Sequence, residues 1–125
     1  MVIFDTNIII DHLRAKKHSI LWELSNEYYL EEIGISIITI TELYTGKSTI
    51  KNEEEERMLS VVSSLKICDY SYEIAELAGK LRRDIKPDIA FPDSIIAATC
   101  IANDAKLATL NKKHFTGIKD LKLAF

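Results

Sequence analysis

Asp5 is the first side chain in this sequence whose surroundings suit chemistry. It follows Val2–Phe4, an apolar run of the kind that forms a buried strand, and a helical pattern begins directly after it. Ligands of open α/β sheets gather beyond the carboxyl ends of the strands, so a strand that ends in Asp places a carboxylate at such a crevice. Asp5 is therefore the first candidate for a catalytic or metal-binding role.

Glu42 is the second candidate, just after a second predicted strand at residues 33–38. A structural role explains it equally well, because Thr39 and Glu42 match the S/T-x-x-E pattern of a helix capping box. Taken alone, capping is the better interpretation. The same position, however, puts Glu42 at the start of a helix that leaves the carboxyl edge of the sheet, where Asp5 is also expected.

Asp93 is the third candidate, directly after Pro92 at the start of a predicted helix. An Asp in a first helical turn interacts favourably with the helix dipole, which would be its structural role. Residues 94–102 are apolar nearly all round, so this helix should be buried. Its acidic amino end then lies toward the interior of one edge, where a carboxylate needs a partner.

Asn111 follows the predicted strand at residues 106–109 and could cap a short helix over residues 112–114. It too belongs at the carboxyl edge. Three carboxylates brought together there would repel, and each would have a raised pKa unless a cation compensated. Oxygen-only ligation selects Mg²⁺ or Mn²⁺ over zinc, and such ions promote phosphodiester hydrolysis.

The elements that must position these residues alternate between strand and helix. The alternation predicts a three-layer α/β/α sandwich with a mainly parallel central sheet, formed as a single domain over residues 1–125. Apolar runs suggest strands at residues 2–4, 33–38, 65–68, 106–109 and, more weakly, 121–123. Helical spacing is found at residues 18–29, 58–65, 74–85 and 94–102, and the acidic run 52–56 suits the first turn of a further helix.

The composition is that of a globular protein with a mildly acidic charge. Of its 125 residues, 47% are hydrophobic and 28% charged, with a net charge of −3. A protein that binds nucleic acid by bulk charge would be basic, so any such contact must be local or bridged by cations. Cys68 and Cys100 lack the spacing of a zinc site, and no apolar run is long enough to span a membrane, so a cytoplasmic protein is expected.

With these positions assembled, the sequence resembles the PIN-domain nucleases, and most closely the VapC-type toxins of prokaryotic toxin–antitoxin systems. The matching segments are residues 2–13, 39–43, 91–99 and 107–115. The resemblance implies that Asp5, Glu42 and Asp93 bind the metal and, with Asn111, form the catalytic set. Thr6, Asn7 and Thr109 would support them. Because Asn111 is a neutral amide where many members carry Asp, one and two metal ions both remain alternatives.

The resemblance also implies a substrate and partners. It suggests an Mg²⁺- or Mn²⁺-dependent endoribonuclease that forms a homodimer and is inhibited by a cognate antitoxin, which lays a segment along a groove near the acids. Glu42 or Asp93 would take a proton. Residues suited to RNA phosphates are Arg82, Arg83, Lys112, Lys113 and His114, with Lys80 and Lys86, although ordinary solvated faces explain each of them equally well.

Other functions fit the same residues less well. A haloacid-dehalogenase-like phosphatase would need a second acid where Asn7 stands and a later G-D-x-x-D stretch, which is missing. A receiver domain would need an acidic pair near the first strand. The remaining alternative is a catalytically silent PIN-like module that binds RNA or protein, and the presence of all three acids argues against it.

Overall fold

The computed structural model describes residues 1–15 and 18–125. In this part of the chain a five-stranded sheet runs in the order β3-β2-β1-β4-β5, and every neighbouring pair of strands is parallel. The strands are β1 (Val2–Phe4), β2 (Ile33–Ser36), β3 (Lys66–Cys68), β4 (Lys106–Ala108) and β5 (Lys122–Leu123). The predicted parallel sheet is confirmed, including its short last strand.

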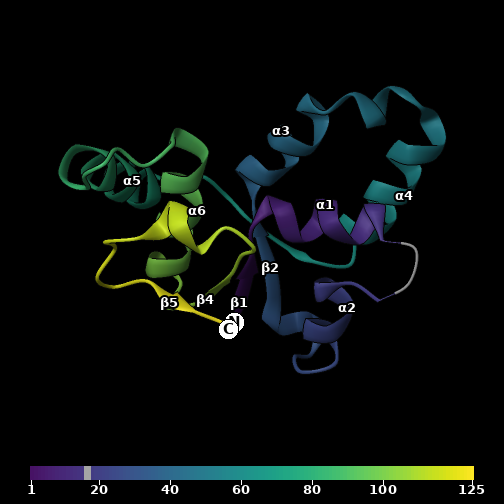
Figure 1. Ribbon diagram of the computed structural model, residues 1–125, viewed down its shortest axis with the longest axis horizontal. Coiled ribbons are helices and arrows are strands. Elements are labelled where there is room, and N and C mark those ends of the chain that lie inside the picture. Colours follow the sequence, from purple (N-terminus) through teal and green to yellow (C-terminus); the bar gives the residue numbers. More distant parts are fainter. Residues whose placement is uncertain (16–17) are drawn as a thin grey trace.

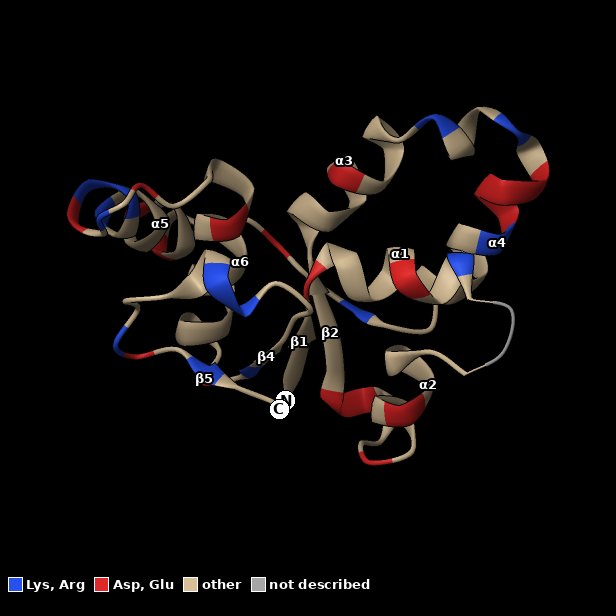
Figure 2. Ribbon diagram, viewed as in Figure 1, with Lys and Arg blue, Asp and Glu red and all other residues tan. Residues whose placement is uncertain are grey.

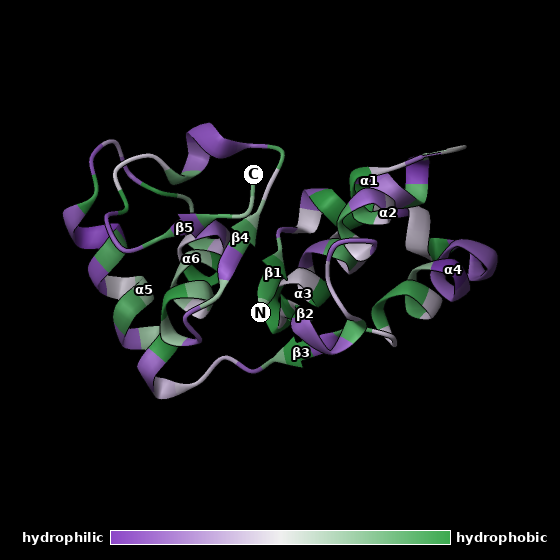
Figure 3. Cartoon of the chain, turned by 90° about the horizontal axis from the view of Figure 1, so that it is seen from below, coloured by the Kyte–Doolittle hydropathy of each residue, from purple (hydrophilic) through white to green (hydrophobic). Residues whose placement is uncertain are grey.

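Helices cover both faces of this sheet (Figure 1). Seen from below, α1 to α4 lie on one side of the central strands, and α5 and α6 lie on the other (Figure 3). The predicted three-layer α/β/α architecture is therefore confirmed. The helices are α1 (Thr6–Arg14), α2 (Ile20–Ser25), α3 (Ile37–Thr45), α4 (Asn52–Val62), α5 (Tyr72–Asp84) and α6 (Phe91–Ala102), with short 3-10 helices η1 (Leu30–Glu32), η2 (Lys47–Ile50) and η3 (Lys112–Phe115).

Strand β1 is buried on both faces, as expected of a central parallel strand. Because successive side chains of a strand point to opposite faces, Val2 and Phe4 join the hydrophobic cluster with α1, α3 and α4, while Ile3 joins the cluster with α6. Helix α6 is buried from Ser94 to Cys100 because it packs between the sheet and α5. The prediction of a buried helix at this place is confirmed.

The winding of the chain reverses at β1. From β1 the chain adds β2 and β3 on one side, and then crosses over to add β4 and β5 on the other. The connections therefore diverge at the carboxyl end of β1 and leave a crevice there, which is where open α/β sheets bind ligands. Asp5 is the first residue beyond that end.

The structure corrects the predicted boundary between β2 and α3. The strand ends at Ser36 and the helix begins at Ile37, because the Ser36 hydroxyl accepts a 3.2 Å hydrogen bond from the Ile38 N–H and caps the helix. The capping-box interpretation of Thr39 and Glu42 is therefore wrong: both lie inside α3. The helix predicted over residues 18–29 is also shorter, since α2 covers only Ile20–Ser25.

Asn111 does precede a short helix, η3, but its side chain makes no capping hydrogen bond there. Within the described ranges, no helix is both long and apolar enough to cross a membrane.

Candidate functional site

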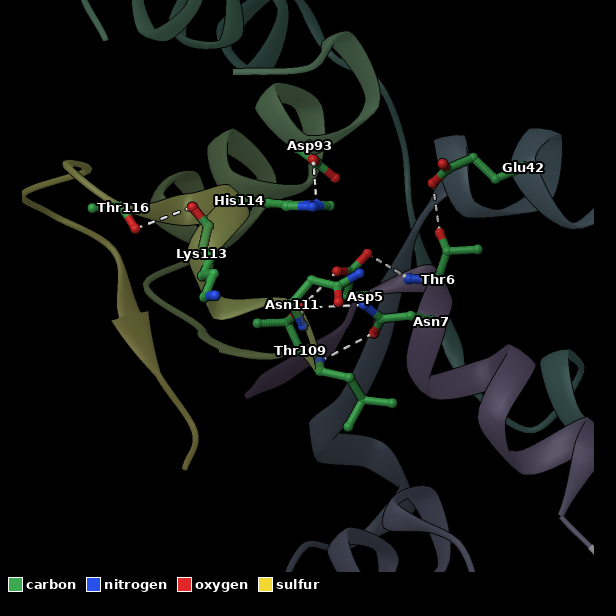
Figure 4. A network of polar contacts seen from close by, with 11 residues as sticks. Asp5, Thr6, Asn7, Glu42, Asp93, Thr109, Asn111, Lys113, His114 and Thr116 are labelled. Carbon is green, nitrogen blue, oxygen red and sulfur yellow. Dashed lines mark hydrogen bonds and ion pairs between the residues drawn. The ribbon is translucent and has the colours of Figure 1, made fainter. Parts of the chain in front are cut away.

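A pocket of about 300 Å³ lies at the carboxyl end of β1, and we call it the acidic pocket. It brings together the four residues that the sequence placed at one edge: Asp5, Glu42, Asp93 and Asn111. In Figure 4, Asp93 and Glu42 approach from opposite sides, with Asp5 between and below them. The complete lining is Asp5, Thr6, Asn7, Ile10, Glu42, Ala90, Pro92, Asp93, Asn111 and His114.

Asp5 is held rigidly at the centre of this pocket. It is the N-cap of α1, where Oδ1 accepts a 2.7 Å hydrogen bond from the Thr6 N–H, and Oδ2 accepts one of 2.7 Å from the Thr109 hydroxyl. Burial raises the pKa of Asp5, while these two hydrogen bonds and the nearby His114 oppose the increase. The carboxylate is thus fixed in orientation but largely deprived of water.

Glu42 is oriented by α1 across the pocket. Its Oε1 accepts a 2.6 Å hydrogen bond from the Thr6 hydroxyl, and the Thr6 and Thr39 hydroxyl oxygens are 3.0 Å apart. A hydroxyl has one proton, and Glu42 as a carboxylate can only accept, so the Thr39 hydroxyl is the donor to Thr6. Thr39, which the sequence suggested as a helix cap, instead completes a buried chain of hydroxyls behind Glu42.

Asp93 lies in the first turn of α6 with its side chain only 15% exposed. Desolvation, followed by the negative charges of Asp5 and Glu42, raises the pKa of Asp93 to about 6. His114 opposes this effect, because its Nδ1 lies 3.3 Å from Oδ2 of Asp93 (Figure 4). The raised pKa therefore reflects burial first, and the negative charge of the neighbouring acids second.

Thr109 connects the supporting residues. Besides donating to Asp5, its hydroxyl oxygen accepts hydrogen bonds from the Asn111 N–H at 3.0 Å and from Nδ2 of Asn7 at 3.4 Å. Oδ1 of Asn7 accepts a 3.2 Å hydrogen bond from the Leu110 N–H. The supporting set predicted from the sequence, Thr6, Asn7 and Thr109, therefore does lie in contact with the acids or with one another.

The family model for the PIN domain matches residues 2–120 of the chain. This chain belongs to the PIN-domain family. The family predicted from the sequence motifs is thereby confirmed.

Proteins similar to this PIN domain match it over nearly its whole length. The protein named Ribonuclease VapC10 from Mycobacterium tuberculosis is 31% identical over all of this chain and 93% of its own. The structure of VapBC2 from Rickettsia felis, bound to a DNA fragment from its promoter, has a TM-score of 0.83 and is 30% identical, covering 98% of this chain and 97% of the other. A toxin–antitoxin complex from Klebsiella pneumoniae has a TM-score of 0.78 at 31% identity, over 100% of this chain and 98% of that one.

The basic residues that the sequence suggested for RNA contacts are divided by the fold. His114 lines the acidic pocket, and Lys112 and Lys113 precede it in η3, which lies beside α6 (Figure 2). Arg82 and Arg83 lie on α5 outside that pocket, where Arg82 lies over the Phe91 ring and Arg83 pairs with Asp84. The structure therefore brings one of the five, His114, into the acidic pocket and places Lys112 and Lys113 directly before it in the chain.

The donor set of this PIN domain suits a hard cation, although its carboxylates are not arranged as ligands. Among the described residues, no three His, Cys, Asp or Glu side chains have the spacing of a metal-binding group. Glu42 is turned toward Thr6, and Asp93 toward His114. The crowding that raises the pKa of Asp93 would be relieved by Mg²⁺ or Mn²⁺. Metal binding by Asp5, Glu42 and Asp93 therefore stays a prediction that the chemistry of the pocket supports.

Sequence reasoning missed the contact of Thr6 with Glu42 and the role of Thr39 behind it. Ile10, Ala90 and Pro92 also line the acidic pocket without having been predicted. The available signal was the hydroxyl that directly follows Asp5, since a residue beside a strand-end carboxylate also faces the crevice. The partner of that hydroxyl, 36 residues later, depends on how α1 and α3 cross.

Proposed function

We propose that this PIN domain is a divalent-cation-dependent endoribonuclease. The observation that carries the proposal is the convergence of three acids and Asn111 in one pocket at the switch point of the sheet. Relatives named ribonucleases, similar over almost the whole chain, support RNA as the substrate. Mg²⁺ or Mn²⁺ held by Asp5, Glu42 and Asp93 would offset the negative charge that builds up on the phosphate oxygens during hydrolysis.

The side chains of the pocket then have separate roles in the reaction. Asp5 is fixed by Thr6 and Thr109, so it presents the same oxygens to every substrate. Water attacks phosphorus and gives its proton to Glu42 or to Asp93, whose pKa is raised to about 6, while the P–O bond to the leaving ribose oxygen breaks and that oxygen takes a proton from solvent. His114 and Lys113 orient the phosphates on the side of the pocket opposite Glu42 (Figure 4).

A cleavage assay tests the proposal directly. Total RNA is incubated with wild-type protein in Mg²⁺, in Mn²⁺ and in EDTA, alongside the variants Asp5→Asn and Asp11→Asn. Asp11 lies on the same helix as the first pocket residues but does not line the acidic pocket, so it is the matched control. Cleavage that requires the cation, is lost in Asp5→Asn and persists in Asp11→Asn is expected. Full activity of Asp5→Asn would contradict the proposal.

The same assay separates the enzyme from its alternative, a catalytically silent module that binds RNA or protein. The observation that favours the silent module is that no three acidic, His or Cys side chains among the described residues have the spacing of a metal-binding group. RNA binding that needs no cation, with no cleavage in Mg²⁺ or Mn²⁺, would support it.

We further propose that this chain is the toxin of a toxin–antitoxin pair and acts in the cytoplasm. A solved neighbour described as a toxin–antitoxin complex supports this. A hollow of about 140 Å³ between α1, α3 and α4 is suited to an antitoxin segment, because apolar residues such as Leu13, Leu43 and Met58 line it and it shares Glu42 with the acidic pocket. A segment bound there would block the acidic pocket. The homodimer implied by the resemblance stays a prediction, which light scattering would test.

A further inference from the structure

A further cavity, of about 480 Å³, adjoins the acidic pocket. We call it the flanking cavity; its walls come from the segment Thr109–His114 and from Phe125. Asn111 and His114 line both cavities, so they form the wall between them. Its volume lies within the range of small-molecule binding sites. A ligand in the flanking cavity would therefore lie directly beside the three acids.

The pairing of β5 with β4 brings Phe125 to this place. The two strands are parallel, with Leu123 opposite Leu107, and the Ala124 N–H donates a 2.8 Å hydrogen bond to the Leu107 carbonyl oxygen. Two residues further along each strand direction, Phe125 comes alongside Thr109. Since the Thr109 hydroxyl donates to Asp5, Thr109 alone separates the Phe125 ring from the acid at the centre of the acidic pocket.

The chemistry of the flanking cavity differs from that of the acidic pocket. Phe125 is 46% exposed, and Nζ of Lys112 lies 5.1 Å from the centroid of its ring. Lys113 adds a second ammonium group to the walls, and Leu110, also partly exposed, adds an apolar one. An exposed ring flanked by cations is the combination with which proteins bind single-stranded nucleic acid, because bases stack on the ring and phosphates attract the lysines.

Resting on the proposed ribonuclease function, we propose that the flanking cavity binds the nucleotide next to the cleavage site of a single-stranded RNA. Its base stacks on Phe125, and its phosphate lies near Lys112 and Lys113. The acidic pocket repels phosphates unless a cation is bound, so the flanking cavity supplies binding energy that the cleavage site itself lacks.

A double-mutant cycle between protein and substrate tests this contact. One substrate is an RNA oligonucleotide that the wild type cleaves at one mapped position. The second substrate has the same sequence but carries an abasic site at the nucleotide next to that position. Removing either the ring or the base should raise KM roughly tenfold with little change in kcat, within the range of one base–aromatic stack. Removing both should cost no more than removing one.

Four variants distinguish stacking from a structural role of the ring. Phe125→Ala and Phe125→Leu both remove the aromatic face, but Leu retains apolar bulk and should keep the wild-type melting temperature. Phe125→Trp should restore KM. Tyr72→Ala, which removes an aromatic side chain 86% exposed on α5, is the matched control and should behave as the wild type.

An unchanged KM in Phe125→Leu, or an abasic penalty equal in wild type and Phe125→Ala, would overturn the inference while leaving the ribonuclease intact. The same holds if Phe125→Ala only weakens inhibition by an antitoxin, because the cavity would then receive a protein segment. A wild type that cleaves no RNA with either cation removes the proposed function and this inference together.

Discussion

The Thr6 hydroxyl donates a 2.6 Å hydrogen bond to Oε1 of Glu42, which joins the first turn of α1 to the second turn of α3. The residue after the central acid thus fixes the orientation of another acid of the pocket. A hydrogen bond to a charged group contributes about 1.5–3 kcal/mol. The position of Glu42 therefore depends on the uncharged side chain of Thr6.

Thr6→Val should lower kcat/KM for RNA by roughly tenfold, because the loss of the donor leaves Glu42 free to turn. Thr6→Ser keeps the hydroxyl and should retain most of the activity. Both variants are compared by cleavage kinetics, with thermal unfolding to check that each is folded. Equal activity in the two variants would show that the hydroxyl does not position Glu42.

Thr109→Val should shift the acidic limb of the pH–rate profile to higher pH. The Thr109 hydroxyl donates to Asp5 and lowers the pKa of this buried acid, so its removal raises the pKa further. A higher pKa means that Asp5 becomes protonated, and unable to bind a cation, at a higher pH. The measurement is kcat/KM against pH for Thr109→Val and for Thr109→Ser, which keeps the donor. Superimposable profiles for the valine variant and the wild type would refute the role.

Without divalent cations, Asp93→Asn should be more stable than the wild type near neutral pH. The pKa of Asp93 is raised from 3.8 to about 6 in the folded protein. The stability contributed by its protonated form is therefore complete below about pH 4 and is lost as the pH rises through about 6. The difference from the variant should be at most about 3 kcal/mol and should shrink toward pH 5.

This difference is measured by urea unfolding in EDTA at several pH values. The exposed Asp120 supplies the control variant Asp120→Asn, which should differ from the wild type by the same small amount at every pH. A stability difference for Asp93→Asn that does not change with pH would mean that the pKa of Asp93 is not raised in the folded protein.

Mg²⁺ or Mn²⁺ should raise the melting temperature of the wild type more than that of Asp93→Asn. A ligand that binds only the folded state stabilises it in proportion to the logarithm of its concentration over Kd, and removal of one carboxylate weakens binding. Thermal unfolding over a series of cation concentrations measures the effect. Equal shifts for the two proteins would place the ion elsewhere.

Much of the architecture could be predicted from local patterns. The apolar runs before Asp5 and Asn111 became β1 and β4, and the apolar helix after Pro92 became α6, buried between the sheet and α5. The boundary at Ser36 was missed because two capping patterns overlap there. Because the Ser36 hydroxyl accepts the hydrogen bond from the Ile38 N–H, Ser36 is the N-cap and Thr39 lies inside the helix.

The sequence by itself determined which residue types stand at the ends of which strands and helices, because that information is carried by neighbours a few positions apart. Only the tertiary structure decided which of them touch. Thr109 reaches Asp5 across 104 residues, Thr6 reaches Glu42, and Phe125 comes beside Thr109 through the register of the last strand pair. Such contacts depend on strand order and on how helices cross the sheet, and no short stretch of sequence contains either.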